Sequence, residues 1–228
     1  ACIGGAATIQ ETEKMLERIE ELFGDIPSAP SPRQPSRPEP EASGEIRLTV
    51  EGKGDTTYIQ ACYRFPAASD PDFFPLTVLD SLLAGPSNLN RSGGGISNKT
   101  SRLYRALVET ELLVGMGGGA QATIDPYLYN IVMVLHPERT PEEALAALDA
   151  EILRVQEEKV SEEEVARAVK QAKALFAYGS ESIANQAFWM GYAEIFADYD
   201  WFLTYLDKLA AVTPDDVQRV AQKYFIKK

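Results

Sequence analysis

Hydrophobic and polar positions alternate in the first half of the chain and follow a helical spacing in the second half. Ile46, Leu48 and Val50 alternate with polar residues, and residues 56–65 are rich in β-branched and aromatic side chains. Both patterns predict strands. Residues 52–55, with the sequence Gly-Lys-Gly-Asp, predict a hairpin turn between them.

Helical spacing predominates after residue 140. Thr140, Ser161 and Thr213 are each followed three residues later by an acidic residue, which is the pattern of a capping box at the start of a helix. Two further helices are predicted near 181–197 and 200–210. The aromatic residues of the first of these have helical spacing and are expected in the core: Phe188, Trp189, Tyr192 and Phe196.

The first half also contains helical segments and two more strands. Helices are predicted at 8–23, 71–84 and 101–110, and strands at 112–120 and 127–136. Strands followed by helices, without strict alternation, predict an α+β fold: a mostly antiparallel sheet with helices packed on one face. The first of the two strands contains Gly117, Gly118 and Gly119, which predict a bulge, a bend or a close approach by another backbone.

A change of composition divides the chain into three parts. Six prolines, with serines and charged residues, fall between residues 26 and 44. Proline lacks the N–H group that a helix or sheet needs, so this segment is predicted to be an extended linker. A recognition role is the alternative. The expected parts are residues 1–25, the linker at 26–44 and the main domain at 45–228.

Composition and charge exclude several classes of protein. The chain has 228 residues, of which 45% are hydrophobic and 25% charged, as in ordinary globular proteins. A net charge of -12 and a pI near 4.6 argue against binding to nucleic acid or to anionic membranes. No apolar run approaches the roughly 20 residues that span a bilayer, and no secretory signal is visible. We therefore expect a soluble protein.

Cysteine and histidine are too few for a metal site of the usual kind. Cys2 and Cys62 have no metal-ligand spacing, and we expect two buried free thiols in strands, with a single bridge as the alternative. A catalytic zinc site normally needs three protein ligands. The one histidine, His136, precedes a proline at the end of an apolar strand, so a structural or solvent-facing role is expected.

Several motifs, in order along the chain, resemble those of one family of peptidases. A glycine-rich segment at 93–99 precedes S-R-L-Y-R-A-L at 101–107, and the other motifs are L-F-G-D-I-P at 22–27, R-F-P-A-A-S-D at 64–70 and V-T-P-D-D-V at 212–217. The series resembles the C-terminal, non-zinc half of the pitrilysin, insulysin and mitochondrial-processing-peptidase family of zinc metallopeptidases.

The resemblance implies a fold, a partner and a cofactor. Members of this family have two homologous α+β halves around a closed chamber; the first half binds zinc and the second helps to hold the peptide. It implies that residues 1–25 are the strand–helix end of the linking region. It also implies that this chain contributes no catalytic and no metal-binding residue. Zinc is then expected in a catalytic half, on the same full-length chain or on a separate subunit.

Two positions depart from the family pattern. Active members have an arginine and, seven residues later, a tyrosine, both directed at the substrate in the zinc site. The matching residues here are Val108 and Gly115. In a shifted register Arg105 takes the arginine position, but the residue seven positions later is then Leu112. Transition-state assistance from this half is therefore not expected.

The glycine-rich segment and the helix after it are the candidate peptide-binding site. The segment resembles the glycine-rich loop of the non-catalytic subunit of mitochondrial processing peptidase. Consecutive glycines allow backbone conformations that other residues rarely adopt, and Arg91, Lys99 and the arginines of the helix make the region basic. A plain surface connection is the alternative. The predicted substrate-binding residues are Gly93, Gly94, Gly95, Asn98, Arg102, Tyr104 and Arg105.

These patterns lead to two hypotheses. The first is the non-catalytic half of a bacterial-type, cytoplasmic zinc metallopeptidase, which closes the chamber and positions a peptide for a zinc-bearing half. The second is a wholly non-catalytic scaffold or assembly subunit, related to the core proteins of respiratory complexes, and Val108 and Gly115 favour it. Either leaves a homodimer open.

Overall fold

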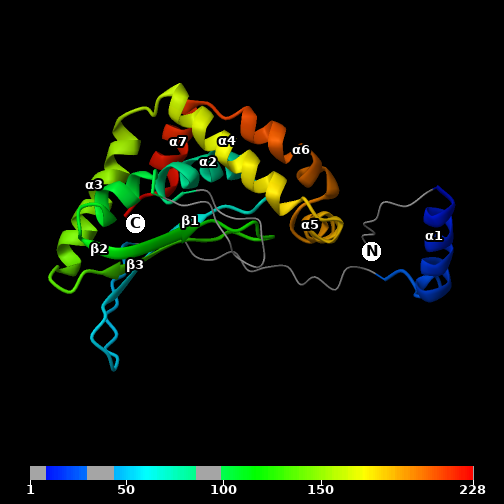
Figure 1. The fold of residues 1–228 in the computed structure, drawn as a ribbon, viewed down its shortest axis with the longest axis horizontal. Coiled ribbons are helices and arrows are strands. Elements are labelled where there is room, and N and C mark those ends of the chain that lie inside the picture. The colour runs from blue at the N-terminus through cyan, green and yellow to red at the C-terminus, as the bar shows by residue number, and fades with distance from the viewer. Residues whose placement is uncertain (1–8, 30–43, 86–98, 228) are drawn as a thin grey trace.

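A three-stranded antiparallel sheet carries helices on one face (Figure 1). The computed structural model describes residues 9–29, 44–85 and 99–227. The strands are β1 (Tyr58–Phe65), β2 (Leu113–Gly119) and β3 (Tyr127–Leu135), with β3 in the middle. The helices are α1 (Ile9–Phe23), α2 (Phe73–Leu83), α3 (Pro141–Glu157), α4 (Glu162–Gly179), α5 (Ile183–Phe196), α6 (Tyr199–Ala210) and α7 (Pro214–Tyr224), with a π-helix, η1 (Tyr104–Val108). The predicted α+β fold is confirmed.

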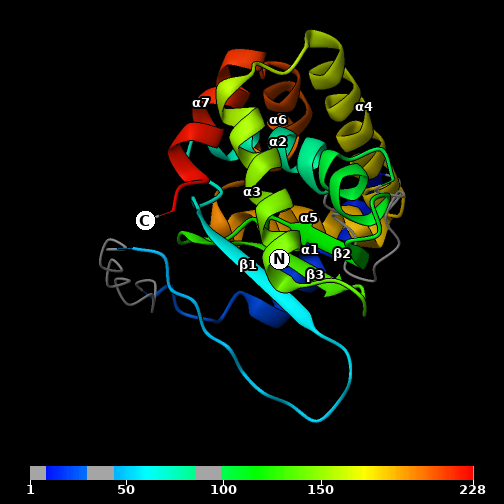
Figure 2. The same ribbon diagram turned by 90° about the vertical axis from the view of Figure 1, so that its left-hand side faces the viewer.

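Strand alternation assigns the two faces of the sheet. Tyr129, Ile131 and Met133 of β3 are buried beneath the helices, whereas Leu128 and Val132 point to the opposite face and are exposed. The face away from the helices is the outer face of the sheet. It is left uncovered by the helices that the structure describes (Figure 2).

Helix α2 lies between the sheet and the other helices. All of its residues are buried, and it contacts α4, α6 and α7 (Figure 2). Its C-terminal end lies close to β2, because a Cβ atom added to Gly118 would lie 2.9 Å from Cβ of Ala84 and 3.2 Å from the Asn130 carbonyl oxygen. A close approach, one of the three predicted roles of these glycines, is therefore confirmed at Gly118, whereas a Cβ atom added to Gly117 would meet nothing within 4 Å. The bulge of β2 lies between Leu113 and Gly115, before the three glycines.

Aromatic side chains fix α6 against the end of β1. The Trp201 indole packs edge-on against Phe73 and Phe196. Its Nε1 donates a hydrogen bond of 2.9 Å to the carbonyl oxygen of Ala68. A buried indole N–H needs such a partner, since leaving it without one is costly.

The three predicted capping boxes are confirmed. Thr140, Ser161 and Thr213 each accept a hydrogen bond from the backbone N–H three residues on, and that residue's carboxylate accepts one in return. Local sequence therefore determines where α3, α4 and α7 begin. None of the described helices is long and apolar enough to cross a membrane.

The strand predicted at Ile46, Leu48 and Val50 is wrong. These residues are not paired with any described strand, and their side chains are between 83% and 88% exposed. Residues 53–55 form a bend, but it does not join two paired strands. Alternation predicts a strand only where one face finds a surface to cover it, and no described residue provides that surface.

The helix predicted at 101–110 is shorter than predicted, and its turns are wider than those of an α-helix. Backbone N–H groups of Glu109 and Leu112 donate to carbonyl groups five residues earlier, those of Tyr104 and Leu107, which is the π-helical pattern. Glu111 then takes a positive φ of 56°, and the chain turns into β2. Such wide turns are frequent at functional sites.

One prediction of burial is wrong, and another is confirmed only in part. Cys62, predicted to be buried, is exposed on β1 as a free thiol, because it points to the outer face of the sheet; Cys2 lies outside the described residues. Of the aromatic residues of α5, Phe196 is buried, Trp189 and Tyr192 are half-buried, and Phe188 is 38% exposed. The helical spacing is correct, but α5 lies at the edge of the helix layer (Figure 1).

An ion cluster joins the start of α2 to α7. The carboxylate of Asp72, only 7% exposed, accepts hydrogen bonds from Arg219 (2.6 Å), Lys223 (2.6 Å) and the Tyr224 hydroxyl (3.0 Å). Burial by itself raises the pKa of Asp72, but these three hydrogen bonds lower it below its usual value. The folded state therefore favours the ionised carboxylate.

We predict that Asp72→Asn lowers the free energy of unfolding at pH 7 by about 2 kcal/mol, because two cations lose their anion. A depressed carboxyl pKa stabilises the folded state above the unfolded pKa, about 3.9, and this contribution disappears as the pH falls through the folded pKa. The difference between Asp72→Asn and the wild type should therefore shrink below about pH 4. Urea unfolding from pH 7 downward measures it, with the exposed Asp55→Asn as control. An equal difference at all pH values would contradict this account.

Candidate functional site

The predicted peptide-binding residues divide into two groups. Gly93, Gly94, Gly95 and Asn98 lie outside the described residues. Arg102, Tyr104 and Arg105 lie on the first turns of the segment that contains η1, which contacts α3 and β2.

Arg102 is bound to another part of the protein. One terminal nitrogen of its guanidinium lies 2.7 Å from Oε1 of Glu164, and the two side chains are 23% and 25% exposed. The other oxygen of Glu164 accepts from the N–H of Ser161 at 3.0 Å, within the capping box of α4. Burial raises the pKa of Glu164, but the hydrogen bonds from Ser161 and Arg102 lower it overall. Arg102 thus connects η1 to the N-terminus of α4.

Arg105 is the predicted arginine whose side chain is available to a ligand. It is exposed and forms no ion pair with a described residue. Tyr104 is half-buried, and its backbone N–H donates to the Ser101 hydroxyl at 3.4 Å. The structure therefore separates a structural arginine from an accessible one, a difference that their spacing in the sequence did not indicate.

The two positions that depart from the family pattern lie on neighbouring elements. Val108 ends η1, is half-buried and packs against the core. Gly115 pairs with Val134 on the outer face of the sheet, and a Cβ atom added there would meet nothing within 4 Å. The position that resembles the family's tyrosine is thus open space on the outer face.

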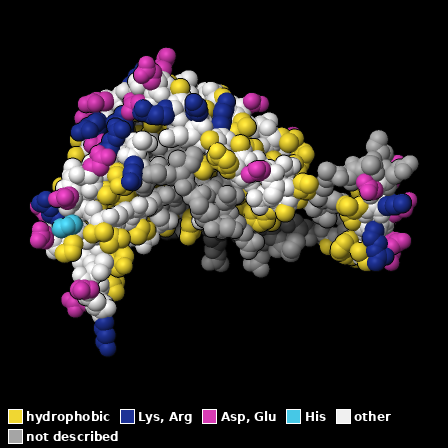
Figure 3. Space-filling model, in the orientation of Figure 1, with side chains coloured by type: hydrophobic (Ala, Val, Ile, Leu, Met, Phe, Trp, Pro, Cys, Tyr) yellow, Lys and Arg dark blue, Asp and Glu magenta, His cyan; other side chains and the backbone are white. Residues whose placement is uncertain are grey.

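The outer face of the sheet carries both apolar and polar side chains. Tyr58, Leu128 and Val132 are exposed on it, 68%, 39% and 42% respectively. On the same face Oδ1 of Asn130 accepts hydrogen bonds from Gln60 (3.0 Å) and from the Cys62 thiol (3.1 Å). Figure 3 shows hydrophobic side chains on the surface near the protruding segment before β1 and on α1.

A buried carboxylate on α2 was not singled out from the sequence. Asp80, on the inner part of α2, is fully buried. Burial, and then the charge of Asp80, raise the pKa of both Tyr129 and Tyr205 above their usual value. The signal was that Asp80 is the single charged residue of an otherwise uncharged helix, α2.

The described residues do not fit a zinc ion. No group of three His, Cys, Asp or Glu side chains comes together in the part of the chain that the structure describes. His136 lies at the end of β3, half-buried, and its Nδ1 accepts from the N–H of Glu138 at 3.3 Å. This is the structural position predicted for it.

Several solved structures share this fold. A protease from Helicobacter pylori matches over 98% of this chain and 51% of the length of the protease, with a TM-score of 0.82 and 18% identity. The inactive peptidase domain of a Bordetella parapertussis protein designated a zinc protease matches 78% of this chain and 91% of its own, at 26% identity and a TM-score of 0.65. One chain of complex III2 from Candida albicans also matches. The match covers 76% of the present protein and 41% of the Candida chain, with a TM-score of 0.61 and 14% identity.

The chain thus spans about half the length of the Helicobacter pylori protease. No protein of curated function matches it. The sequence profile of the family described as the peptidase M16 inactive domain matches residues 1–172, three quarters of the chain. Together with the α+β fold and the shared structures, this shows that the chain belongs to the family of peptidase M16 inactive domains.

Proposed function

We propose that this chain is the non-catalytic half of a zinc-dependent metallopeptidase, which closes a chamber and positions a peptide for a zinc-bearing half. The observation that carries the proposal is the outer face of the sheet, which the described helices leave uncovered and on which Gly115 lies. By the family resemblance, this position faces the substrate in the zinc site. The face can then hold a peptide, but it offers no tyrosine hydroxyl to the reaction.

The exposed apolar face of helix α1 supports the proposal that a second half binds to this chain. Its sequence alternates apolar and charged residues at helical spacing, yet Met15, Leu16, Leu22 and Phe23 are 39% to 56% exposed. An amphipathic helix needs a surface to cover its apolar face. In Figure 1 α1 lies apart from the sheet and its helices. We infer that this face packs on the zinc-bearing half.

The role proposed for this chain is to position the peptide substrate. Zinc, held by the partner half, would activate the water that attacks the peptide bond. On this half, Arg105 offers a guanidinium to acidic side chains of the peptide, and the outer face limits access of bulk water. Holding the peptide in one orientation accelerates its cleavage even without a reacting group on this side.

The proposal is tested by adding this chain to a separately produced zinc-bearing half from the same source. We expect peptide hydrolysis to rise at least tenfold, because proximity and orientation account for large parts of a catalytic barrier. The control is an unrelated acidic protein at the same concentration. Hydrolysis by this chain alone, or no rise in activity although the two halves bind, would contradict the proposal.

Arg105 and Arg102 should behave differently in the reconstituted enzyme. Arg105→Ala is expected to raise KM for an acidic peptide roughly tenfold without changing the free energy of unfolding, because it removes a charged hydrogen bond from an exposed side chain. Arg102→Ala is expected to lower the free energy of unfolding by about 1–3 kcal/mol, because it leaves Glu164 without its cation. Peptide kinetics and urea unfolding measure the two effects. If Arg105→Ala leaves KM unchanged, Arg105 is not part of the site.

A scaffold or assembly subunit is the second candidate. The loss of polar groups at Val108 and Gly115 favours it, and the shared fold with a chain of a respiratory complex agrees with it. The two candidates predict different results when the chain binds a partner. A scaffold leaves peptide hydrolysis unchanged, whereas the proposed half raises it.

A further inference from the structure

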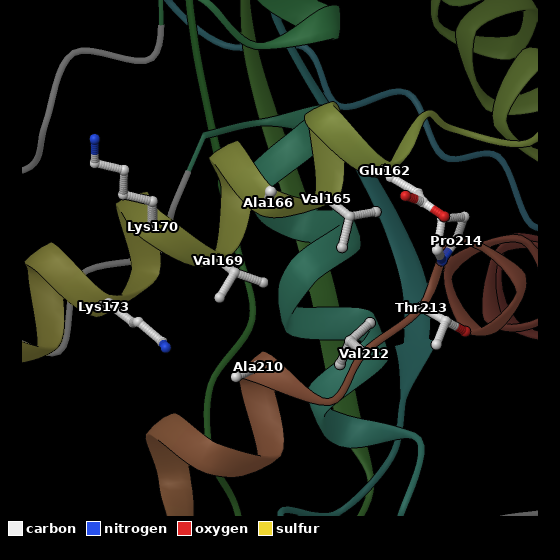
Figure 4. Close-up of a pocket in the computed structure, with 10 residues that line it drawn as sticks. All are labelled: Glu162, Val165, Ala166, Val169, Lys170, Lys173, Ala210, Val212, Thr213 and Pro214. Atoms are coloured by element: carbon white, nitrogen blue, oxygen red, sulfur yellow. The ribbon is translucent and has the colours of Figure 1, made fainter.

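The most exposed large hydrophobic side chains of the described residues lie on one short segment before β1. They are Ile46, Leu48 and Val50, with exposed fractions of 83%, 85% and 88%. In the groove between α4 and the connection from α6 to α7, by contrast, the valines are at most 9% exposed, so that apolar surface is already covered (Figure 4). The segment before β1 is therefore the apolar surface that most needs a partner.

Residues 45–53, which we call the arm, project from the body of the protein. Residues 45–52 contain no turn or helix, and a bend at 53–55 precedes β1. Both ribbon views show the segment before β1 extending away from the sheet (Figure 1, Figure 2). No backbone hydrogen bond joins residues 45–52 to another described residue. The N–H and C=O groups of the arm are thus available to pair with another strand.

The side chains of the arm form an apolar row and a charged row, because alternate residues of a strand lie on the same side. The hydrogen bond of 2.7 Å from Nε of Arg47 to Glu45 agrees with this arrangement. The charged row is centred on a threonine, and each charge has the opposite sign to the charge at the same distance on the other side of that threonine. The row consists of Glu45, Arg47, Thr49, Glu51 and Lys53.

This charge pattern makes the arm complementary to a second copy of itself. In an antiparallel pair with its two-fold axis at Thr49, Arg47 lies opposite Glu51 of the other copy. Glu45 lies opposite Lys53 in the same pair, and the two threonines face each other at the centre. Cross-strand pairs of opposite charge and pairs of threonines stabilise neighbouring strands, whereas like charges destabilise them.

The charges also distinguish this register from its neighbours. A two-fold axis at Leu48 would place Glu45 opposite Glu51, and an axis at Val50 would place Arg47 opposite Lys53. Both registers replace an attraction with a repulsion, and a parallel pair in register would place every charge opposite a like charge. With the axis at Thr49, Leu48 lies opposite Val50, so that the apolar rows of the two copies cover part of each other.

We propose that two copies of this chain associate through their arms, which pair as antiparallel strands about a two-fold axis at Thr49. Such an interface is isologous, since both copies use the same surface. The arm contains none of the residues on which the proposed peptidase role rests. Either proposal can therefore fail without the other.

Disulfide formation between single cysteines tests the register in the full chain. In a Cys2→Ser/Cys62→Ser background, Thr49→Cys places two thiols directly opposite each other, with Cα atoms about 4.5–5.5 Å apart, which a disulfide can bridge. Leu48→Cys is the matched control, because its thiol lies diagonally from its copy, at about 7–8 Å. In a glutathione redox buffer we expect Thr49→Cys to form covalent dimers at least tenfold faster than Leu48→Cys. An equimolar mixture of Leu48→Cys and Val50→Cys should link as fast as Thr49→Cys.

The strength of association is measured by sedimentation velocity on the chain with its own cysteines reduced. We expect a Kd of about 100 μM, because an isolated pair of strands is only marginally stable in water. Glu45→Lys/Glu51→Arg makes the charged row wholly cationic, and Arg47→Glu/Lys53→Glu makes it wholly anionic. Each variant should self-associate at least tenfold more weakly, whereas an equimolar mixture of the two should associate at least as tightly as the wild type.

Net charge alone predicts a different result for the cationic variant. The chain carries a net charge of -12, so replacing two glutamates with cations lowers the repulsion between copies and would by itself favour association. The matched control is Glu13→Lys/Glu17→Arg, which makes the same change of charge at two exposed residues of α1. It should leave the Kd within twofold of the wild type. Circular dichroism confirms that each variant is folded.

Several results would overturn the proposal. Equal rates of disulfide formation in Thr49→Cys and Leu48→Cys would contradict the register. An unchanged Kd in the two charge variants would show that the arm pairs with a different surface of the second copy, such as the outer edge of β1. A mixture of these variants that associates no better than either alone, or no dimer at a concentration of about 1 mM, would exclude pairing between arms.

Discussion

The structure depends on the burial of α2 on every side. An eleven-residue helix without an exposed position requires a layer on each face, the sheet on one and α4, α6 and α7 on the other. Its N-terminal end is held by the cluster around Asp72, and its C-terminal end lies against Gly118, where a side chain has no room. Both ends of α2 are therefore fixed.

This arrangement gives the two faces of the sheet different roles. The inner face is closed by α2 and contributes to the core. The outer face displays Gly115, Cys62 and exposed apolar side chains such as Val132, and the described helices do not cover it. A half of a two-part enzyme would need such a face, because one layer of the sheet belongs to its own core and the other to the shared chamber. The proposed function follows from this division, together with membership of the family of inactive domains.

Sequence alone predicted the features that depend on neighbouring residues. Three capping boxes located the starts of α3, α4 and α7, because the hydrogen bonds join residues only three positions apart. It failed where distant residues decide the outcome. The strand expected at Ile46, Leu48 and Val50 lacks a partner, and sheet pairing cannot be read from alternation alone.

At the candidate site, too, sequence reasoning failed where residues distant in the chain decide the outcome. The family resemblance and the basic surroundings made both Arg102 and Arg105 look like ligands for a peptide, but Arg102 pairs with Glu164, 62 residues further along the chain. The burial of Asp80 also arises from tertiary packing. Motif resemblance identified the family, while the separation of structural from accessible residues required the structure.

The claim that the outer face of the sheet turns toward a zinc-bearing half can be measured with Cys62, a free and exposed thiol on that face. In a Cys2→Ser variant, Cys62 is labelled with a bulky polyethylene-glycol maleimide, with and without the zinc-bearing half. A closed chamber predicts that labelling slows at least tenfold when the partner half is bound. An unchanged rate, under conditions where the two halves bind, would contradict the account.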